Sequence, residues 1–142
     1  MLKLEKIESI MTKGAFTVEL DDSLKKADDI MKEENVHQVP VLENGKLVGI
    51  ITSKKLNEYS LRQIYEVDAD KEDIGYNKIS DYQDIFDKNV HIIYPEDSIA
   101  KAIEILAKKH IEFLPVVDWD NNLVGIVTVF DILFYIKKEF LS

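Results

Sequence analysis

The fold is decided by a stretch near the C-terminus, His110-Ile-Glu-Phe-Leu-Pro-Val-Val-Asp118, which a short polar turn joins to Leu123-Val-Gly-Ile-Val-Thr-Val-Phe-Asp-Ile-Leu133. Two short runs rich in valine and isoleucine, separated by a turn, indicate a pair of antiparallel strands. The second run passes directly into a segment with apolar residues at helical spacing. The stretch therefore predicts a strand, a turn, a second strand and a helix, in that order.

An earlier part of the chain repeats this plan. Val36-His-Gln-Val-Pro-Val-Leu42 corresponds to the first strand, and Leu47-Val-Gly-Ile-Ile-Thr-Ser-Lys-Lys-Leu56 corresponds to the second strand and the start of the helix. The alignment begins where Ile10 meets Ile85, 75 residues later, and one extra residue in the second turn raises the offset to 76. A match held over about forty residues with a single gap indicates an internal duplication.

Local signals define the elements of each repeat. Ser23 and Ser98 precede segments with apolar residues at helical spacing, and a serine oxygen there can accept a hydrogen bond from the first turn of a helix. Asn44-Gly45 predicts a type I′ hairpin turn, because both residue types tolerate positive φ. Pro40 lacks an N–H donor, so we expect it at the start or the edge of its strand.

The last helix, predicted from Val129 to Leu141, is apolar on more than one face. Phe130 and Phe134, flanked by Tyr135, form a stripe in addition to the one that can cover the core. A second apolar stripe of this kind usually needs a partner surface. We therefore expect at least a homodimer. The other stripe suffices to cover a core, and it consists of Val129, Ile132, Leu133, Ile136 and Phe140.

Composition excludes several classes of protein. The 142 residues contain no cysteine, so a disulfide framework, a thiolate metal site and a thiol nucleophile are excluded. The net charge of −9 argues against nucleic acid as a partner, since surfaces that bind duplexes are usually basic. The N-terminus carries Glu5 and Glu8, unlike a signal peptide, and no apolar run approaches the ~18 residues that span a bilayer. The sequence predicts a soluble, cytoplasmic protein with no membrane partner.

No pattern of metal ligands is present in the sequence. The histidines His37, His91 and His110 lack the spacing of a zinc site. The acidic residues in the range 68–73 lack the glycine and the terminal glutamate of a calcium-binding loop. We therefore expect no metal, and we interpret this region as an acidic linker.

Taken together, these motifs resemble the CBS-motif family, named for cystathionine β-synthase, in which two tandem motifs form a Bateman module. The stretches Ile10-Met-Thr-Lys-Gly and Ile85-Phe-Asp-Lys-Asn also match the usual opening of a motif. The resemblance implies an α/β fold, an α+β sandwich of two βαββα repeats related by a pseudo-twofold, with the sheets packed together and the helices outside. It divides the chain into a first motif (1–60), an acidic linker (61–80) and a second motif (81–142). Since no catalytic domain is left over, it also implies a free-standing regulatory module.

The resemblance has consequences for function. Family members commonly bind AMP, ADP or ATP in two clefts between the repeats, some bind S-adenosylmethionine or another adenosyl ligand, and many form flat dimers. We therefore expect a non-catalytic sensor that binds an adenine nucleotide as a ligand, not as a catalytic cofactor, and whose state a regulated protein reads. The alternative is a purely structural dimerisation module without ligand. An enzyme is disfavoured, because the sequence has no Walker-type phosphate loop and suggests no nucleophile–base pair.

The ligand signature of the family, Gly-x-x-Thr/Ser-x-x-Asp, is complete in the second repeat as Gly125, Thr128 and Asp131. One carboxylate can accept hydrogen bonds from both neighbouring hydroxyls of a ribose, and a helix start offers free N–H groups to an anion. Gly125 is expected to let the backbone pass close to the ligand. The same spacing fits a capping box, in which Thr128 caps the helix and Asp131 reaches back. Both roles stay open.

The first repeat departs from this signature. It keeps Gly49 and Thr52, but Lys55 stands where the aspartate is expected, and a lysine cannot accept a hydrogen bond. The first cleft is therefore predicted to be empty or to bind ribose differently, and the two clefts to be unequal. Lys54 and Lys55 could instead neutralise phosphates, or they could form an ordinary solvated helix start.

Family position implies further residues in the two clefts. Lys88 in the second cleft and Lys13 in the first are candidate phosphate contacts, with ordinary surface charge as the alternative. For each apolar residue, core packing is the alternative role. The second cleft is expected to be lined by Val90, His91, Ile111, Glu112, Phe113, Pro115 and Ile126. The first, weaker cleft is expected to be lined by Val36, His37, Gln38, Pro40, Ile50 and Thr52.

Overall fold

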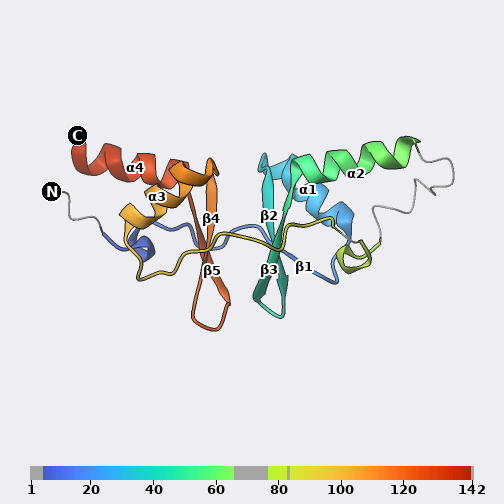
Figure 1. Ribbon diagram of the computed structural model, residues 1–142, viewed down its shortest axis with the longest axis horizontal. Coiled ribbons are helices and arrows are strands. Elements are labelled where there is room, and N and C mark those ends of the chain that lie inside the picture. The colour runs from blue at the N-terminus through green and yellow to red at the C-terminus, as the bar shows by residue number, and fades with distance from the viewer. Residues whose placement is uncertain (1–4, 66–76, 83, 142) are drawn as a thin grey trace. The chain divides into compact units, whose positions relative to one another are not determined.

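The computed structural model describes residues 5–65, 77–82 and 84–141, with the backbone alone for 61–65 (Figure 1). The chain forms two compact units. The first-repeat unit comprises residues 16–90, and the second-repeat unit comprises residues 1–15 together with 91–142. The expected mixed α/β fold is confirmed, since each unit combines a small sheet with two α-helices.

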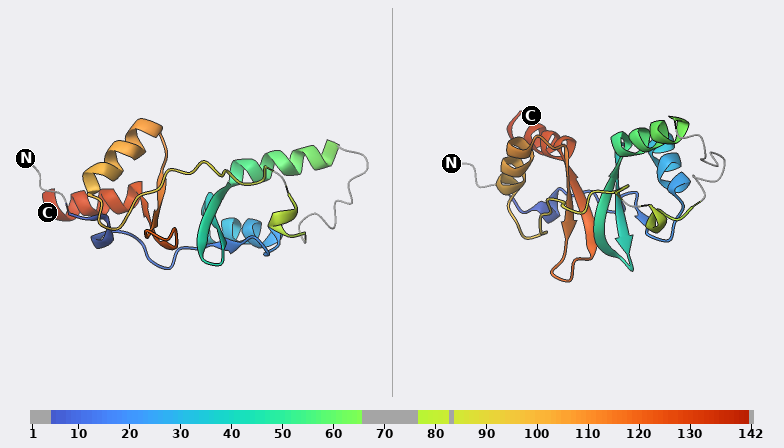
Figure 2. Two further views of the ribbon diagram at one scale, coloured as in Figure 1. Left: turned by 60° about the horizontal axis from the view of Figure 1, so that its bottom comes forward. Right: turned by 45° about the vertical axis from the view of Figure 1, so that its right-hand side comes forward.

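Each unit follows the predicted order of strand, hairpin and helix. The first-repeat unit contains β1 (Val18–Glu19), α1 (Leu24–Glu34), β2 (Gln38–Glu43), β3 (Lys46–Thr52) and α2 (Ser53–Tyr65). Its sheet has the order β1-β2-β3. The second-repeat unit contains α3 (Ile99–Lys109), β4 (Phe113–Val117), β5 (Leu123–Thr128) and α4 (Val129–Phe140) (Figure 2). In place of a first strand it has a single parallel bridge between Ile93 and Val116, the counterpart of the Val18–Val41 pair.

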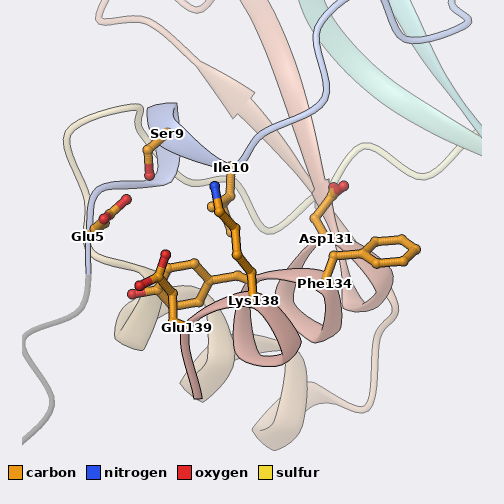
Figure 3. A pocket seen from close by; sticks show the side chains of 8 residues that line it. Glu5, Ser9, Ile10, Asp131, Phe134, Lys138 and Glu139 are labelled. Atoms are coloured by element: carbon orange, nitrogen blue, oxygen red, sulfur yellow. The ribbon is translucent and has the colours of Figure 1, made fainter. Parts of the chain in front are cut away.

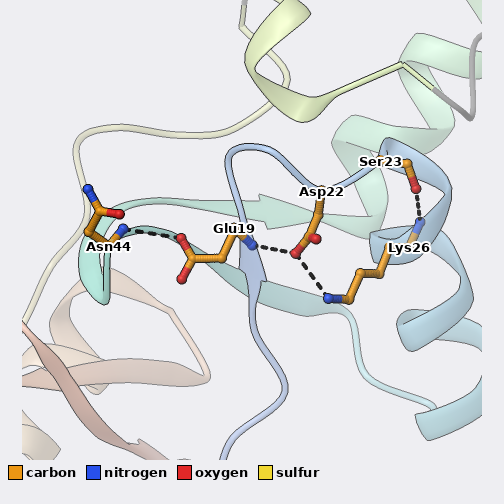
Figure 4. Close-up of polar contacts among 5 residues, drawn as sticks. All are labelled: Glu19, Asp22, Ser23, Lys26 and Asn44. Atoms are coloured by element: carbon orange, nitrogen blue, oxygen red, sulfur yellow. Dashed lines mark hydrogen bonds and ion pairs between the residues drawn. The ribbon is translucent and has the colours of Figure 1, made fainter.

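The two predicted serine caps are confirmed. The hydroxyl of Ser23 accepts a hydrogen bond from the Lys26 N–H at 3.2 Å (Figure 4). The hydroxyl of Ser98 accepts one from the Lys101 N–H, also at 3.2 Å. A serine cap satisfies one of the N–H groups that the first turn of a helix leaves without a partner. The duplication therefore extends to the hydrogen bonds that begin the helices.

The hairpin turn of the first repeat is also confirmed. Asn44 and Gly45 both have positive φ, at 53° and 82°, as a type I′ turn requires. In the longer second turn the Asp118 carboxylate accepts hydrogen bonds from the N–H groups of Asp120 and Asn122, both at 2.9 Å. These contacts add to two hydrogen bonds within the backbone of the turn, from the Asp118 N–H to the Asn122 carbonyl and from the Asn121 N–H to the Asp118 carbonyl, both at 3.0 Å.

The expectation for Pro40 was wrong, because this residue lies within the central strand β2, opposite Ile50. The N–H and C=O groups of Ile50 are both bonded to the backbone of Asp87, at 3.0 and 2.8 Å. Both backbone groups of Ile50 thus point away from Pro40, and Pro40 and Ile50 form a non-hydrogen-bonded pair of the antiparallel ladder. The missing donor of proline costs no bond to β3 at this register.

The opening segments of the two motifs are exchanged between the units. We define the first opening segment as residues 5–12 and the second as residues 79–82 and 84–87. Ile7, in the short 3₁₀-helix Ile7–Ser9, is fully buried in the core of the second-repeat unit. Ile79, in the 3₁₀-helix Ile79–Asp81, is fully buried in the core of the first-repeat unit. Each core is therefore completed by the opening residues of the other motif.

The predicted faces of α4 need correction. Tyr135 is buried beside Ile132 in the core, whereas Leu133 is 54% exposed and Phe140 is 44% exposed. Ile132 and Tyr135 are three positions apart and share a face, while Leu133 is rotated by about 100° from Ile132. The exposed stripe of α4 thus consists of Phe130, Leu133 and Phe134, and Leu141 continues it directly after the helix.

The predicted acidic linker is described only in part. Residues 61–65 complete α2, and the Asn77 carbonyl accepts a hydrogen bond from the Leu24 N–H at 3.1 Å. The acidic residues in the range 68–73 lie outside the described residues. Among the helices that the structure describes, none is long and apolar enough to cross a membrane. Within the same described ranges, no group of three histidine or acidic side chains is placed to hold a metal ion.

The Asp22 carboxylate stabilises the turn before α1, and its charge gives a prediction for acid stability. It accepts from the Glu19 N–H at 2.7 Å and from Lys26 Nζ at 3.0 Å (Figure 4). Burial raises the pKa of this carboxyl, but the Glu19 hydrogen bond and Lys26 outweigh it, so the pKa lies below its usual value. A lowered pKa adds stability above the unfolded pKa of about 3.9, and this stability is lost as the pH falls through the folded pKa.

We therefore expect Asp22→Asn to flatten the acid limb of the stability curve. The free energy of unfolding of the parent should fall more steeply below about pH 4 than that of the variant. Urea denaturation at a series of pH values measures the difference. Parallel curves for parent and variant between pH 5 and pH 2.5 would contradict the role assigned to this carboxylate.

Candidate functional site

The start of α4 presents the Asp131 carboxylate. The Thr128 hydroxyl accepts a hydrogen bond from the Asp131 N–H at 3.1 Å, and Asp131 Oδ2 accepts one from the Thr128 N–H at 2.9 Å. This reciprocal pair is the capping box that the spacing of the two residues allows. The box occupies one oxygen of the carboxylate and fixes the direction of the side chain. A structural role for Asp131 is thus established, and it leaves Oδ1 outside the box.

Thr12, from the first opening segment, also reaches this carboxylate. Its hydroxyl lies 3.1 Å from Asp131 Oδ1 and 3.3 Å from Oδ2, and it donates to them. The backbone of Thr12 exchanges two hydrogen bonds with Ile126 of β5, at 2.8 and 2.9 Å. The exchange of opening segments therefore places an aliphatic hydroxyl on the carboxylate, and this contact has the chemistry that a ribose hydroxyl would have.

Gly125 lies beside the first opening segment. A Cβ atom at this position would lie 2.9 Å from the Thr12 carbonyl oxygen and 3.0 Å from the Met11 sulfur. The absence of a side chain thus makes room for the first opening segment. Close approach of a ligand is not needed to explain this glycine.

A cavity of about 290 Å³ adjoins Asp131 along α4 (Figure 3). Its walls come from α4 and from the first opening segment, and all belong to the second-repeat unit. In Figure 3 the side chain of Lys138 extends from α4 toward Ile10, and the Phe134 ring points away from this group. The cavity is lined by Glu5, Ser9, Ile10, Asp131, Phe134, Tyr135, Lys138 and Glu139.

The other residues expected in the second cleft divide between the two units. Phe113 and Pro115 are buried on β4, and Ile126 is half-buried on β5. The Glu112 side chain is exposed, while its carbonyl accepts from the Val129 N–H at 3.0 Å and so anchors the start of α4. Ile111 and His91 also belong to this unit. The structure places Lys88 and Val90 in the first-repeat unit instead.

The first-repeat unit has a counterpart of this site with its charges rearranged. The Thr52 hydroxyl accepts from the Lys55 N–H at 3.1 Å, as Thr128 does in the second unit. Asp87, from the second opening segment, exchanges two backbone hydrogen bonds with Ile50 of β3. Its carboxylate lies 3.5 Å from Lys55 Nζ. Lys55 is therefore paired with a carboxylate that comes from the opening segment.

The residues expected in the first cleft lie mostly in this unit. Pro40 and Ile50 are buried, and Val36 and Gln38 are half-buried. The His37 carbonyl accepts from the Ser53 N–H at 2.9 Å, which repeats the Glu112 contact. Lys13 is grouped instead with the second-repeat unit, directly after Thr12.

Sequence reasoning missed Thr12 and Asp87 as site residues. The signal was present in the alignment of the repeats, because Thr12 aligns with Asp87 at the offset of 75, and Lys55 aligns with Asp131 at the offset of 76. Both carboxylates therefore belong to the second repeat, and the first repeat has Thr12 and Lys55 at the equivalent positions. Each unit has one of the two carboxylates, because Asp87 lies in the first-repeat unit and Asp131 in the second-repeat unit. The exchange of opening segments, which local patterns do not reveal, is what makes the two positions neighbours.

The comparisons with known proteins agree with this architecture. The CBS domain family matches residues 7–62 and 82–138, most of the chain. The chain belongs to the CBS domain family and carries two CBS domains in tandem. It is 28% identical over 131 residues to inosine-5′-monophosphate dehydrogenase of Methanocaldococcus jannaschii, a match that covers 92% of this chain and 23% of that protein. The chain spans between a fifth and a quarter of the length of several such relatives.

Two solved structures share nearly the whole fold. The CBS domain pair of protein MJ0100, in complex with 5′-methylthioadenosine and S-adenosyl-L-methionine, has a TM-score of 0.73 and 27% identity, and the match covers 96% of this chain and 98% of that one. CBSX2 in complex with AMP has a TM-score of 0.77 and 20% identity, and the match covers 94% of this chain and 97% of that one. The second likeness concerns the fold alone. This protein is a tandem CBS domain pair.

Proposed function

We propose that the chain is a non-catalytic sensor that binds an adenine nucleotide, with Asp131 as the acceptor for the ribose hydroxyls. The observation that carries this proposal is the contact between Thr12 and Asp131, because a hydroxyl donates to both oxygens of a carboxylate at the start of a helix. A ribose hydroxyl can make the same contact, while the capping box keeps the carboxylate in place.

The remaining polar groups suit a ligand with a ribose and an anionic end. Lys13 follows Thr12 directly and is exposed. An exposed lysine next to the ribose acceptor offers a point charge to a phosphate. Binding would then transmit to the opening segment, since Thr12 must yield its hydrogen bonds to the incoming hydroxyls. We propose that a regulated protein reads this rearrangement.

S-adenosylmethionine, or a related adenosyl ligand, is the second candidate. The CBS pair of protein MJ0100, 27% identical to this chain, was solved with 5′-methylthioadenosine and S-adenosyl-L-methionine. Two further carboxylates, Glu5 and Glu139, line the cavity beside Asp131, and Lys138 is the one ammonium group among its lining residues, so carboxylates are in excess. Such a setting favours a ligand with positive charge over one with several phosphates.

Extraction of the natural ligand tests the proposed function. The purified protein is denatured, and the released small molecules are identified by mass spectrometry. We expect AMP, ADP or ATP, and S-adenosylmethionine would favour the second candidate. Protein that releases no adenosyl compound, and then binds none in a titration, would support the purely structural role.

We further propose that the protein forms a homodimer through α4. The exposed stripe includes Phe130 at 69% exposure and Phe134 at 67%, beside Leu133. An apolar groove next to it is formed by residues of α3 and α4, among them Ile103 and Ile132. Large exposed aromatic side chains in one patch mark an interaction surface, and a twofold dimer uses the same patch on both chains.

Phe134→Glu is therefore expected to split the dimer and leave the fold intact, because it places two charges in one interface. Light scattering should give twice 16.4 kDa for the parent and 16.4 kDa for the variant. Phe16→Glu is the matched control, since Phe16 is 48% exposed and lies outside α4; it should stay dimeric. A parent mass of 16.4 kDa at every concentration would contradict the dimer.

A further inference from the structure

The two units differ in where their carboxylate comes from. In the second-repeat unit the helix supplies it as Asp131, and the opening segment supplies the neutral Thr12. In the first-repeat unit the helix supplies Lys55, and the opening segment supplies Asp87. The strand contacts are the same in both, since Thr12 bridges Ile126 and Asp87 bridges Ile50. Each unit thus presents one carboxylate beside the start of its second helix.

From this we infer that Asp87 is the ribose acceptor of a second adenosyl site, in the first-repeat unit, where the family signature lacks its aspartate. The inference rests on the proposed function of Asp131. In the first-repeat unit the proposed acceptor belongs to the opening segment, whereas in the second-repeat unit it belongs to the helix. A carboxylate from either element offers the same lone pairs to a pair of hydroxyls.

The position of Asp87 is well defined by its backbone. Its N–H donates to the Ile50 carbonyl at 2.8 Å, and its carbonyl accepts from the Ile50 N–H at 3.0 Å. Gly49 allows this approach, because a Cβ atom there would lie 2.5 Å from the Asp87 carbonyl oxygen and would also strike the Phe86 ring. The side chain of Asp87 is 54% exposed, so a ligand can reach it.

Lys55 has a defined part in this site. Its ammonium group lies 3.5 Å from Asp87 Oδ1, with its side chain 34% exposed. An ammonium group beside one oxygen neutralises the carboxylate and competes with the ribose hydroxyls for its lone pairs. The site of Asp87 is therefore weaker than that of Asp131. In this role Lys55 lowers the affinity for the ligand, whereas a lysine that contacts phosphate would raise it.

The test is a calorimetric titration with AMP and with 5′-methylthioadenosine, which carries the same ribose without a phosphate. The parent should show a strong and a weak site. Asp87→Asn should remove the weak site for both ligands, a loss of about ten- to a hundredfold, and leave the strong site unchanged. Asp131→Ala should remove the strong site and leave the weak one. Asn keeps the size of the side chain and the backbone contacts with Ile50, so the fold should be retained.

Lys55→Met separates this role from a phosphate contact. We expect the variant to bind both ligands more tightly at the weak site, because Asp87 loses its competing ammonium group. Lys54→Met makes the same change of charge at the neighbouring exposed lysine and should leave the weak site unchanged. If Lys55→Met weakens AMP binding and spares 5′-methylthioadenosine, Lys55 contacts phosphate and the inference is overturned.

The failure of this inference is distinguishable from the failure of the proposed function. A parent with one site, abolished by Asp131→Ala and indifferent to Asp87→Asn, would overturn the role of Asp87 and leave that of Asp131 intact. A parent that binds neither ligand would overturn both.

Discussion

Asp131→Ala is expected to weaken the binding of an adenine nucleotide at the strong site by ten- to a hundredfold. The variant leaves the ribose hydroxyls without an acceptor, and the loss of a hydrogen bond to a charged group costs about 1.5–3 kcal/mol. Calorimetric titration of parent and variant measures the change. Equal affinities would show that the carboxylate serves only the capping box.

This variant needs a control for the helix cap, because Asp131 also accepts from the Thr128 N–H. Loss of a cap costs about 1 kcal/mol of stability on its own. Asp131→Asn keeps a side-chain oxygen for the Thr128 N–H and removes the charge. If weaker binding follows from the lost carboxylate, the asparagine variant should bind weakly while its stability stays close to that of the parent. If weaker binding follows from a frayed helix, the asparagine variant should bind like the parent.

Gly49→Ala is expected to lower the free energy of unfolding by about 1–3 kcal/mol, the usual range for overpacking of a close-packed site. The added Cβ would lie 2.5 Å from the Asp87 carbonyl oxygen and would strike the Phe86 ring. Backbone cannot yield as a flexible side chain can, so the second opening segment must move away from β3. Urea denaturation measures the loss.

Two other glycines provide the comparison for this variant. Gly125→Ala meets the Thr12 carbonyl at 2.9 Å and the flexible Met11 side chain, so its loss should be smaller. The Cβ added by Gly14→Ala would have no other atom within 4 Å, but Gly14 has a φ of +70°. Only backbone strain of about 1–2 kcal/mol is therefore expected for this variant. Nucleotide binding at the strong site should survive Gly49→Ala. A Gly49 variant as stable as the parent would show that the opening segment is not held against β3 as described.

The sequence predicted those features that local chemistry determines. The Ser23 and Ser98 caps, the Asn44-Gly45 turn and the capping box of Thr128 each depend on a side chain and the backbone within three residues of it. For the same reason the order of elements in both repeats followed from residue spacing alone. The motif made the Asp131 carboxylate a candidate ligand-binding group, and the capping box fixes the direction of its side chain and leaves Oδ1 outside the box.

Features that depend on distant segments were beyond this reasoning. Thr12 and Asp131 are 119 positions apart, and nothing in either local sequence indicates that they meet. The buried position of Tyr135 depends on which face of α4 meets the core, and two apolar stripes leave that choice open. Pro40 was placed wrongly because its partner Ile50 bonds to Asp87, a distant residue of the second opening segment, so that this position of the central strand needs no N–H donor toward β3.

The central claim is that this CBS domain pair binds an adenine nucleotide through the hydroxyls of its ribose. Calorimetric titration of the parent protein with AMP tests it most directly. We expect saturable binding dominated at low concentration by one site per chain, and a marked loss of affinity for the 2′-deoxy analogue, which lacks one of the two hydroxyls. Equal affinity for AMP and its 2′-deoxy analogue, or no saturable binding of AMP up to millimolar concentration, would contradict the account.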